Sequence, residues 1–234
     1  MFDLGHTLID YYNDWEAPEN KAIKEFHQAV VNAGADADEG DFCKYAKGLL
    51  ETGRKRKREE MVEIPLEKVL ESILVRYGME EEEELLKEGF EVFYGVLEEN
   101  RSLIPGAKDA LEKVRDRGYA IGLISDVAWG LPSEYPLRDL EFYGLNEYFD
   151  DLVFSTDVGL RKPHPRMFKL ALYNLGADAS ESFYVGNSYR CDIKGAVAAG
   201  LKAYLKESGH PEKVDGVIPT AVISSWDELD QYLG

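Results

Sequence analysis

Residues 183–205 read FYVGNSYRCDIKGAVAAGLKAYL, and this stretch contains two short apolar segments on either side of a helical pattern. Phe183 to Val185 and Leu201 to Leu205 have the length and apolar character of buried strands. Arg190 to Ala199, which lies between them, predicts a helix. A strand, a helix and a second strand in this order are typical of a parallel sheet that helices cover on both faces.

The same alternation extends towards the N-terminus as far as Pro105-Gly106. The sequence predicts helices at Ala107 to Val114, Leu137 to Phe142, Arg166 to Leu175 and from Trp226, and strands at Tyr119 to Ile124 and Leu152 to Ser155. Met1 to Ile9 is apolar around one aspartate, and we expect it to begin with the first strand. The fold class predicted is therefore α/β.

The segment between the first strand and the rest of the sheet is predicted to be entirely helical. Apolar residues recur at helical spacing in Ala17 to Ala33, Gly40 to Leu50, Leu66 to Tyr77 and Glu80 to Leu97. We therefore expect two domains. Residues 1–13 and 100–234 would form the α/β core, and residues 14–99 would form a helical cap inserted into it.

The composition is strongly acidic and limits the partners. Asp and Glu number 45 against 27 Lys and Arg, which gives a formal net charge of −18. Such a surface repels nucleic-acid backbones and anionic membranes, but a local cluster of cations still permits a small anionic substrate such as a phosphate ester. No apolar run approaches the ~20 residues that span a bilayer, and we expect no membrane partner. The chain is expected to be a monomer or a weak homodimer.

Cysteine usage agrees with a reducing compartment. Cys43 and Cys191 lie far apart and form neither a disulfide framework nor a zinc-ligand pattern. We therefore expect a cytoplasmic protein.

Polar residues follow several of the predicted strands. They are Asp3, Ser125 with Asp126, Lys162, and Asn187 with Asp192. Ligands of open parallel sheets bind beyond the carboxyl ends of the strands, at the point where strand order reverses. The sequence thus predicts that an acid, a hydroxyl, a cation and an amide–acid pair meet at one edge of the sheet.

Four motifs resemble those of the haloacid dehalogenase superfamily, in the same order and along almost the whole chain. FDLGHTL at Phe2 to Leu8 resembles the first motif, and LISD at Leu123 to Asp126 resembles the second. GLRKPHPRMF at Gly159 to Phe168 is similar to the third, and VGNSYRCDIKGAVAAG at Val185 to Gly200 is similar to the fourth. The resemblance implies a hydrolase with a Rossmann-like, doubly wound parallel-sheet core and the inserted α-helical cap of subclass I.

The resemblance also implies a role for each polar residue. Asp3 would be the catalytic nucleophile and form a covalent intermediate. Lys162 would neutralise Asp3 and the transferring group, and Ser125 would hold phosphate oxygens together with Asp126. Thr7 would fix the Asp3 loop through its hydroxyl.

A Mg²⁺ cofactor is implied in the same way. The family holds it with the nucleophile, the carbonyl two residues later and an acid of the fourth motif, which here are Asp3, Gly5 and Asn187. Asp192 is the second acid of that motif and would assist at the metal site. Mg²⁺ prefers oxygen ligands and usually keeps several waters.

Two positions depart from the phosphatase pattern. Gly5 stands where phosphatases usually carry a second Asp, the general acid, and His6 beside it could supply the proton instead. Asn187 replaces an aspartate, which removes one negative charge from the metal site. Dehalogenases of the superfamily carry Asn in the fourth motif and need neither the metal nor the second Asp, although phosphatases with an Asp-Leu-Gly first motif also occur.

Three functions therefore stay open. The leading hypothesis is a Mg²⁺-dependent phosphatase of small phosphomonoesters that works through an aspartyl-phosphate intermediate. The second is a 2-haloacid dehalogenase-like carbon–halogen hydrolase, and the third is a catalytically weakened member that binds or regulates.

Two further features concern the start of the chain and the cap. A central strand normally has about 5–6 residues, yet only Met1 and Phe2 precede Asp3, so either the natural chain begins earlier or a shortened strand supports Asp3 poorly. The basic run Arg54 to Arg58 is either a solvated helix face or a site that recruits an anionic substrate. Tyr11, Tyr12 and Trp15 are expected to line the pocket or to pack in the core.

Overall fold

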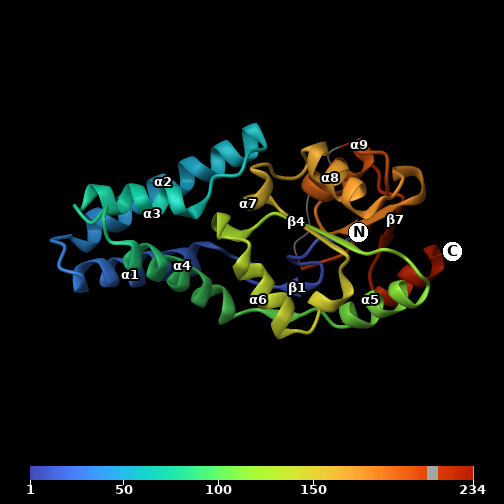
Figure 1. Ribbon diagram of the computed structural model, residues 1–234, viewed down its shortest axis with the longest axis horizontal. Coiled ribbons are helices and arrows are strands. Elements are labelled where there is room, and N and C mark those ends of the chain that lie inside the picture. The colour runs from blue at the N-terminus through green and yellow to red at the C-terminus, as the bar shows by residue number, and fades with distance from the viewer. Residues whose placement is uncertain (210–215, 234) are drawn as a thin grey trace.

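A parallel sheet lies at the centre of one half of the molecule. The computed structural model describes residues 1–209 and 216–233 (Figure 1). The sheet strands are β3 (Gly122–Ser125), β4 (Asp151–Phe154), β5 (Phe183–Gly186), β6 (Lys202–Lys206) and β7 (Ala221–Ile223). β3 pairs with β4, β5 with β6, and β6 with β7, and every pair is parallel.

The N-terminal segment completes the sheet between β3 and β5. Phe2 forms parallel bridges to Leu123 on one side and to Val185 on the other. The Phe2 amide donates to the Gly122 carbonyl at 2.9 Å, and the Asp3 amide donates to the Val185 carbonyl at 2.9 Å. Asp3 therefore sits at the end of a segment bonded to both neighbours, which contradicts the alternative in which a shortened strand supports it poorly.

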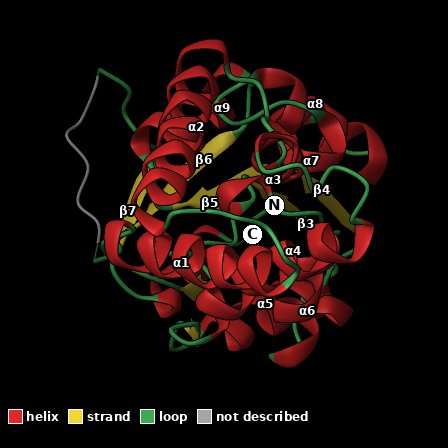
Figure 2. Cartoon of the chain, turned by 90° about the vertical axis from the view of Figure 1, so that its left-hand side faces the viewer, coloured by secondary structure: helices red, strands yellow, loops and turns green. Residues whose placement is uncertain are grey.

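Helices cover both faces of the sheet (Figure 2). α8 (Pro165–Leu175) and α9 (Lys194–Ala198) lie on one face, and α5 (Ala107–Asp116) and α6 (Glu134–Phe142) lie on the other. Successive residues of a strand point to opposite faces of the sheet. Ile124 packs with α8 and α9, whereas Leu123 packs with α5. This arrangement confirms the predicted α/β class. Shorter helices are α7 (Ser155–Val158), η1 (Ala128–Gly130), η2 (Asn146–Tyr148), η3 (Ala179–Glu181), the π-helical η4 (Tyr189–Ile193) and η5 (Trp226–Tyr232).

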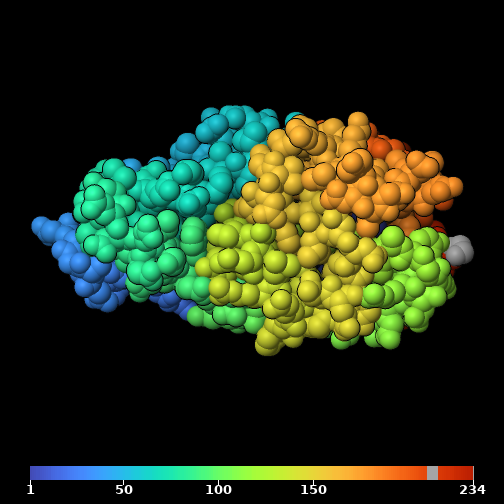
Figure 3. Space-filling model, viewed as in Figure 1, coloured from blue at the N-terminus to red at the C-terminus, as the bar shows by residue number. Residues whose placement is uncertain are grey.

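Four helices form the other half of the molecule, at one end of the elongated shape in Figure 3. They are α1 (Glu16–Asn32), α2 (Glu39–Glu60), α3 (Leu66–Arg76) and α4 (Glu83–Glu98). Two connections join them to the sheet and run antiparallel as β1 (Ile9–Asp10) and β2 (Ser102–Leu103). In the ranges 1–209 and 216–233, no helix combines the length and the apolar character needed to cross a membrane.

The longest helix differs from its prediction. α2 extends past the expected end at Leu50 to Glu60, so the whole basic run 54–58 is helical. The helix begins where the Asp38 carboxylate accepts a bond from the Asp41 amide at 2.9 Å. It ends at Met61, whose left-handed φ of 54° turns the chain away. Nothing between these points breaks a helix, because lysine and arginine are good helix formers.

Candidate active site

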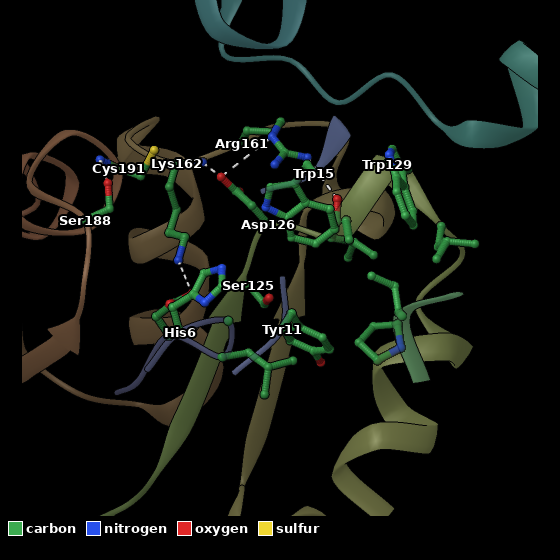
Figure 4. Close-up of a pocket in the computed structure, with 18 of the residues that line it drawn as sticks. His6, Tyr11, Trp15, Ser125, Asp126, Trp129, Arg161, Lys162, Ser188 and Cys191 are labelled. Atoms are coloured by element: carbon green, nitrogen blue, oxygen red, sulfur yellow. Dashed lines mark hydrogen bonds and ion pairs between the residues drawn. The ribbon is translucent and has the colours of Figure 1, made fainter. Parts of the chain in front are cut away.

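A cavity of about 540 Å³ lies where the loops at the carboxyl edge of the sheet face the four helices. Figure 4 shows labelled side chains from four parts of the chain: the segment before α1, the end of β3 with the loop after it, the loop before α8, and the segment after β5. The predicted site residues that line it are Asp3, Gly5, His6, Ser125, Asp126, Lys162, Asn187 and Asp192. The remaining one, Thr7, is fully buried beneath Asp3.

A buried lysine joins two aspartates at the floor of this cavity. Lys162 Nζ lies 2.6 Å from Asp3 Oδ1 and 2.7 Å from Asp192 Oδ1. It also donates to the Ile124 carbonyl at 3.0 Å and approaches the Tyr184 hydroxyl at 2.9 Å. One ammonium group therefore neutralises part of the charge of two largely buried carboxylates.

These contacts set the ionisation of the pair. Burial raises the pKa of Asp3 from 3.8 to about 6, although the charge of Lys162 acts in the opposite direction. Burial also lowers the pKa of Lys162, but Asp192 and Asp3 outweigh this and raise it well above its ordinary value. At neutral pH Asp3 is mainly a carboxylate and Lys162 is an ammonium ion, so a nucleophile and a neutralising cation stand side by side.

Thr7 holds the other oxygen of Asp3 and also lies close to Asn187. The Thr7 hydroxyl donates to Asp3 Oδ2 at 2.8 Å and lies 3.4 Å from the amide oxygen of Asn187. The amide nitrogen of Asn187 donates to the Ser208 hydroxyl at 3.3 Å, which turns the oxygen towards Asp3. A carboxylate oxygen and an amide oxygen thus approach the same hydroxyl.

This donor set suits a hard cation. Asp3 and Asn187 supply side-chain oxygens, and the neighbouring backbone of Gly5 lines the same cavity. Asp192 is occupied elsewhere, because its oxygens accept bonds from Lys162, Tyr184 and the Ser188 amide. In residues 1–209 and 216–233 no group of three or more His, Cys, Asp and Glu side chains could hold a metal. The side-chain oxygens of Asp3 and Asn187 and the carbonyl of Gly5 are nevertheless the type of ligand that Mg²⁺ takes together with water.

Ser125 and Asp126 end β3 beside Lys162. Ser125 is buried at the cavity wall. The Asp126 carboxylate accepts a bond from the Lys162 amide at 3.0 Å and lies 3.6 Å from Arg161 Nε. Asp126 therefore holds the loop that carries Lys162, a contact that the sequence prediction of substrate binding did not include.

His6 occupies a strained position next to the nucleophile. Its backbone is left-handed, with a φ of 57°, and its Nδ1 lies 2.5 Å from Asp10 Oδ1. Non-glycine residues with positive φ are concentrated at functional sites. The ring lines the cavity, so His6 is placed within the site rather than packed away from it.

Sequence reasoning missed a buried glutamate where the helical half meets the sheet. The side chain of Glu63 is fully buried between Lys57 Nζ at 2.7 Å and Arg161 Nη1 at 2.5 Å. The Ser155 hydroxyl also donates to it at 2.5 Å. Burial lowers the pKa of Lys57, against the raising effect of Glu63. No motif marks Glu63, because two of its three partners, Ser155 and Arg161, lie 92 and 98 positions away in the sequence.

A second missed acid, Asp139, ties three aromatic or cationic residues together. The Tyr11 and Tyr94 hydroxyls donate to its carboxylate at 2.7 Å and 2.9 Å, and Arg101 forms an ion pair with it. Asp139 is buried although it lies on an amphipathic helix. The signal for Asp139 in the sequence was that an aspartate lies among the apolar residues on one face of α6.

The basic run divides between the cavity and solvent. Arg54 and Lys57, three residues apart on α2, line the cavity, whereas Arg56 pairs with Glu60 on the exposed face. Arg54 forms an ion pair with the buried Glu19. The run is thus neither a fully solvated face nor a free cationic patch.

Comparisons with known proteins agree with this arrangement. The family model described as haloacid dehalogenase-like hydrolase matches residues 1–200. The chain is 30% identical to phosphoglycolate phosphatase of Escherichia coli over 245 residues, covering 100% of this chain and 91% of that protein. It is 30% identical to ribulose-1,5-bisphosphate 5-phosphatase of Halopiger xanaduensis over 224 residues, covering 92% and 88%.

A third relative matches more strongly over a shorter region. The chain is 36% identical to pyrimidine 5'-nucleotidase YjjG of Escherichia coli over 144 residues, which are 61% of this chain and 62% of that protein. This match therefore spans less than two thirds of the nucleotidase.

Solved structures share the fold along the whole chain. A 2-haloacid dehalogenase from Pseudomonas syringae aligns with a TM-score of 0.71 and 25% identity, covering 99% of this chain and 96% of that one. A phosphatase of the same superfamily from Thermococcus onnurineus aligns with a TM-score of 0.65 and 21% identity, covering 100% and 96%. The second likeness shows the fold alone.

Proposed function

Because the chain belongs to the haloacid dehalogenase-like hydrolase family, we propose that it is a phosphatase of small phosphomonoesters with Asp3 as its nucleophile. Three of its relatives bear phosphatase or nucleotidase names, which supports this reaction class. The observation that carries the proposal is the buried contact of 2.6 Å between Lys162 Nζ and Asp3 Oδ1. A carboxylate attacks a phosphate dianion only where cations offset the repulsion between them, and Lys162 is placed to do so.

The reaction would proceed in two displacements. A carboxylate oxygen of Asp3 forms a bond to phosphorus while the bond from phosphorus to the ester oxygen breaks, which gives an aspartyl phosphate and the alcohol. Water then attacks phosphorus, and phosphate leaves as the Asp3 carboxylate reforms. Ser125, at the buried end of β3, would donate to the phosphate oxygens in both steps.

Mg²⁺ would be held by Asp3, the Gly5 carbonyl and Asn187. When bound it would supply positive charge to the phosphate oxygens and orient them for attack. Asn187 contributes an oxygen without a charge, so we expect weaker metal binding than an aspartate would give. Asp192 would act on Lys162, which it contacts at 2.7 Å, rather than as a ligand.

The leaving oxygen needs a proton, and Gly5 cannot supply one. We propose His6 as the donor, because its ring lines the cavity and Asp10 fixes its Nδ1 at 2.5 Å. Histidine is a common general acid and base, so a protonated His6 would give up a proton in the first step and recover one from water in the second.

Residues 14–99 would act as the cap of the site. The helical half contributes Trp15, Arg54 and Lys57 to the cavity wall, so its position controls the access of water and substrate.

A second candidate is hydrolysis of a carbon–halogen bond, in which Asp3 attacks carbon and halide leaves. Gly5 and Asn187 favour it, since this reaction needs neither a general acid nor a metal. The structural likeness to a 2-haloacid dehalogenase is consistent with it.

One set of assays separates these functions. We expect the protein to release p-nitrophenol from p-nitrophenyl phosphate in the presence of Mg²⁺, to lose this activity in EDTA, and to lose it in Asp3→Asn with folding intact. Chloride release from 2-chloropropionate in EDTA would instead support the dehalogenase. Activity that survives in Asp3→Asn would refute both proposals.

A further inference from the structure

The names of three relatives indicate substrates that carry different groups on the phosphate. One acts on pyrimidine nucleotides, one on phosphoglycolate and one on a sugar bisphosphate. The first leaving group is an uncharged aromatic nucleoside, whereas the other two carry a second anion. The leaving group would contact the wall of the cavity on the side away from Lys162. The residues of that wall therefore determine which of the three kinds of leaving group fits.

Two tryptophans form this wall, one from each half of the molecule. Trp15 precedes α1 and Trp129 lies in the loop after β3, and their rings meet edge to face with centroids 5.4 Å apart. Both line the cavity, and Figure 4 shows Trp129 and Tyr11 on the side opposite Lys162 and Ser188. Phe93 packs edge to face against Trp129 from behind, at 5.1 Å between centroids.

The Trp129 ring is fixed by several contacts, and the backbone of this residue is strained. Its φ is 52°, and the next residue, Gly130, has a φ of 83°. A side chain at Gly130 would place its Cβ 2.5 Å from the Ile64 carbonyl oxygen, so this turn requires glycine. The indole N–H donates to the buried Glu19 at 3.0 Å. A strained residue fixed from several sides is typical of a ligand-binding position.

The hydroxyls of the three tyrosines that line the cavity are bonded to carboxylates. Tyr11 and Tyr94 donate to Asp139, and Tyr135 donates to Glu91 at 3.1 Å. Tyr94 and Tyr135 are each 2% exposed and have Arg138 over their rings, so the half-buried Tyr11 is the tyrosine of this wall that can present a ring face to a ligand.

The cations on the cap-facing side are already neutralised. Arg54 pairs with Glu19, and Lys57 and Arg161 share Glu63. Arg161 Nε also lies 3.6 Å from Asp126, so these three cations face three carboxylates. Both glutamates are buried, with side chains 8% and 0% exposed. A second phosphate or a carboxylate of the substrate would have to compete with these carboxylates, which makes binding of such an anion here unfavourable.

The size of the cavity agrees with a large leaving group. Its volume of about 540 Å³ lies in the usual range for ligands of drug size. We propose that the site takes nucleoside 5'-monophosphates, with the base against Trp15 and Trp129, in preference to phosphoglycolate or a sugar bisphosphate. The expected effects on catalysis rest on the proposed function, whereas the expected binding of the base does not.

Binding is tested first, without turnover. The chain contains three tryptophans, so its fluorescence reports on Trp15, Trp129 and Trp226. We expect uridine 5'-monophosphate to quench the fluorescence of Asp3→Asn saturably, and 2-phosphoglycolate to leave it unchanged. Trp226→Phe, in the sheet half, should keep the quenching, and Trp15→Phe combined with Trp129→Phe should lose it. No quenching by uridine or adenosine 5'-monophosphate would overturn the proposal.

Kinetics provide the second test. In Trp15→Leu we expect kcat/KM for uridine 5'-monophosphate to fall about tenfold, because one ring contact is lost. For acetyl phosphate, whose leaving group carries no ring, we expect a clearly smaller fall than for the nucleotide, because the ring contact contributes only to the nucleotide. An equal fall for both substrates would assign Trp15 a purely structural role and refute the inference.

The two proposals fail in different ways. Hydrolysis of acetyl phosphate or phosphoglycolate without nucleotide binding would leave the phosphatase in place and overturn the base site. Quenching by the nucleotide without hydrolysis of any ester would retain the base site and overturn the phosphatase.

Discussion

The Glu63 carboxylate, in the connection between α2 and α3, accepts a hydrogen bond of 2.5 Å from the hydroxyl of Ser155, which begins α7. The backbone reinforces this contact, since Val62 bridges Leu160 and the Arg161 amide donates to the Met61 carbonyl at 2.9 Å. The helical half is therefore joined to the sheet half through the loop that immediately precedes Lys162.

Substitution of this glutamate tests the junction. Glu63→Gln keeps the shape but leaves the cations of Lys57 and Arg161 without their shared charge, so we expect a loss of about 3 kcal/mol in the free energy of unfolding. Urea denaturation measures it. Glu60→Gln is the matched control, because its ion pair with Arg56 is exposed and should change stability by about 0.5 kcal/mol or less. Similar effects of the two variants would contradict the role of Glu63.

The contacts of Lys162 with Asp3 and Asp192 predict how stability changes in a double mutant. Lys162→Met leaves the Asp3 and Asp192 carboxylates buried without a cation, which should destabilise the protein by about 3–5 kcal/mol and abolish hydrolysis. Adding Asp192→Asn removes one of these charges and should restore more than about 1 kcal/mol of stability without restoring activity. Additive stability effects in the four proteins of the cycle would show that Lys162 and Asp192 do not act together.

The ionisation of Asp3 predicts a pH-dependent stability. Its folded pKa of about 6 exceeds the unfolded value of 3.8, so the group stabilises the protein below pH 3.8 and loses this contribution as the pH rises through 6. Asp3→Asn should therefore gain stability relative to the unsubstituted protein between pH 4 and pH 7, by on the order of 3 kcal/mol at most. Thermal unfolding in EDTA measures this difference, and a gap that is constant with pH would refute it.

Substitution of two glycines by alanine should change stability in opposite directions. Gly195 in α9 is closely packed, whereas Gly48 in α2 has open space around it. A Cβ at Gly195 would lie 2.3 Å from the Phe168 ring and 3.1 Å from the Pro163 backbone, next to Lys162. Gly195→Ala should therefore cost about 1–3 kcal/mol and reduce activity. Gly48→Ala is the control, because no atom lies within 4 Å and alanine favours α2, which should add about 0.5–1 kcal/mol. Two variants of equal stability would contradict this packing.

The role of His6 is tested with leaving groups of different basicity. If His6 donates the proton, His6→Gln should lower kcat for an alkyl phosphate about 100-fold, because an alkoxide is a poor leaving group. For p-nitrophenyl phosphate we expect a change of about threefold or less, since p-nitrophenolate leaves without a proton. Equal reductions for both esters would assign His6 a structural role.

Strand-and-helix alternation was sufficient to predict the architecture. Residues 183–205 form β5, η4, α9 and β6 near the expected positions, because apolar strands and amphipathic helices are local patterns. The three-residue β7 escaped notice, since Val222 is partly exposed and so short a segment has no clear pattern. The predicted strand at Tyr119 begins only at Gly122, where pairing with β4 starts.

The sequence by itself determined which polar residues end the strands, and hence that Asp3, Ser125, Lys162 and Asn187 line one cavity. That outcome follows from a parallel sheet, whose strands all deliver their carboxyl ends to the same edge. The tertiary structure decided the rest. Glu63 became a partner of Arg161, and Trp15 met Trp129, only because the helical half folds back onto the loops of the sheet. Contacts between residues about 100 positions apart depend on packing and leave no local pattern in the sequence.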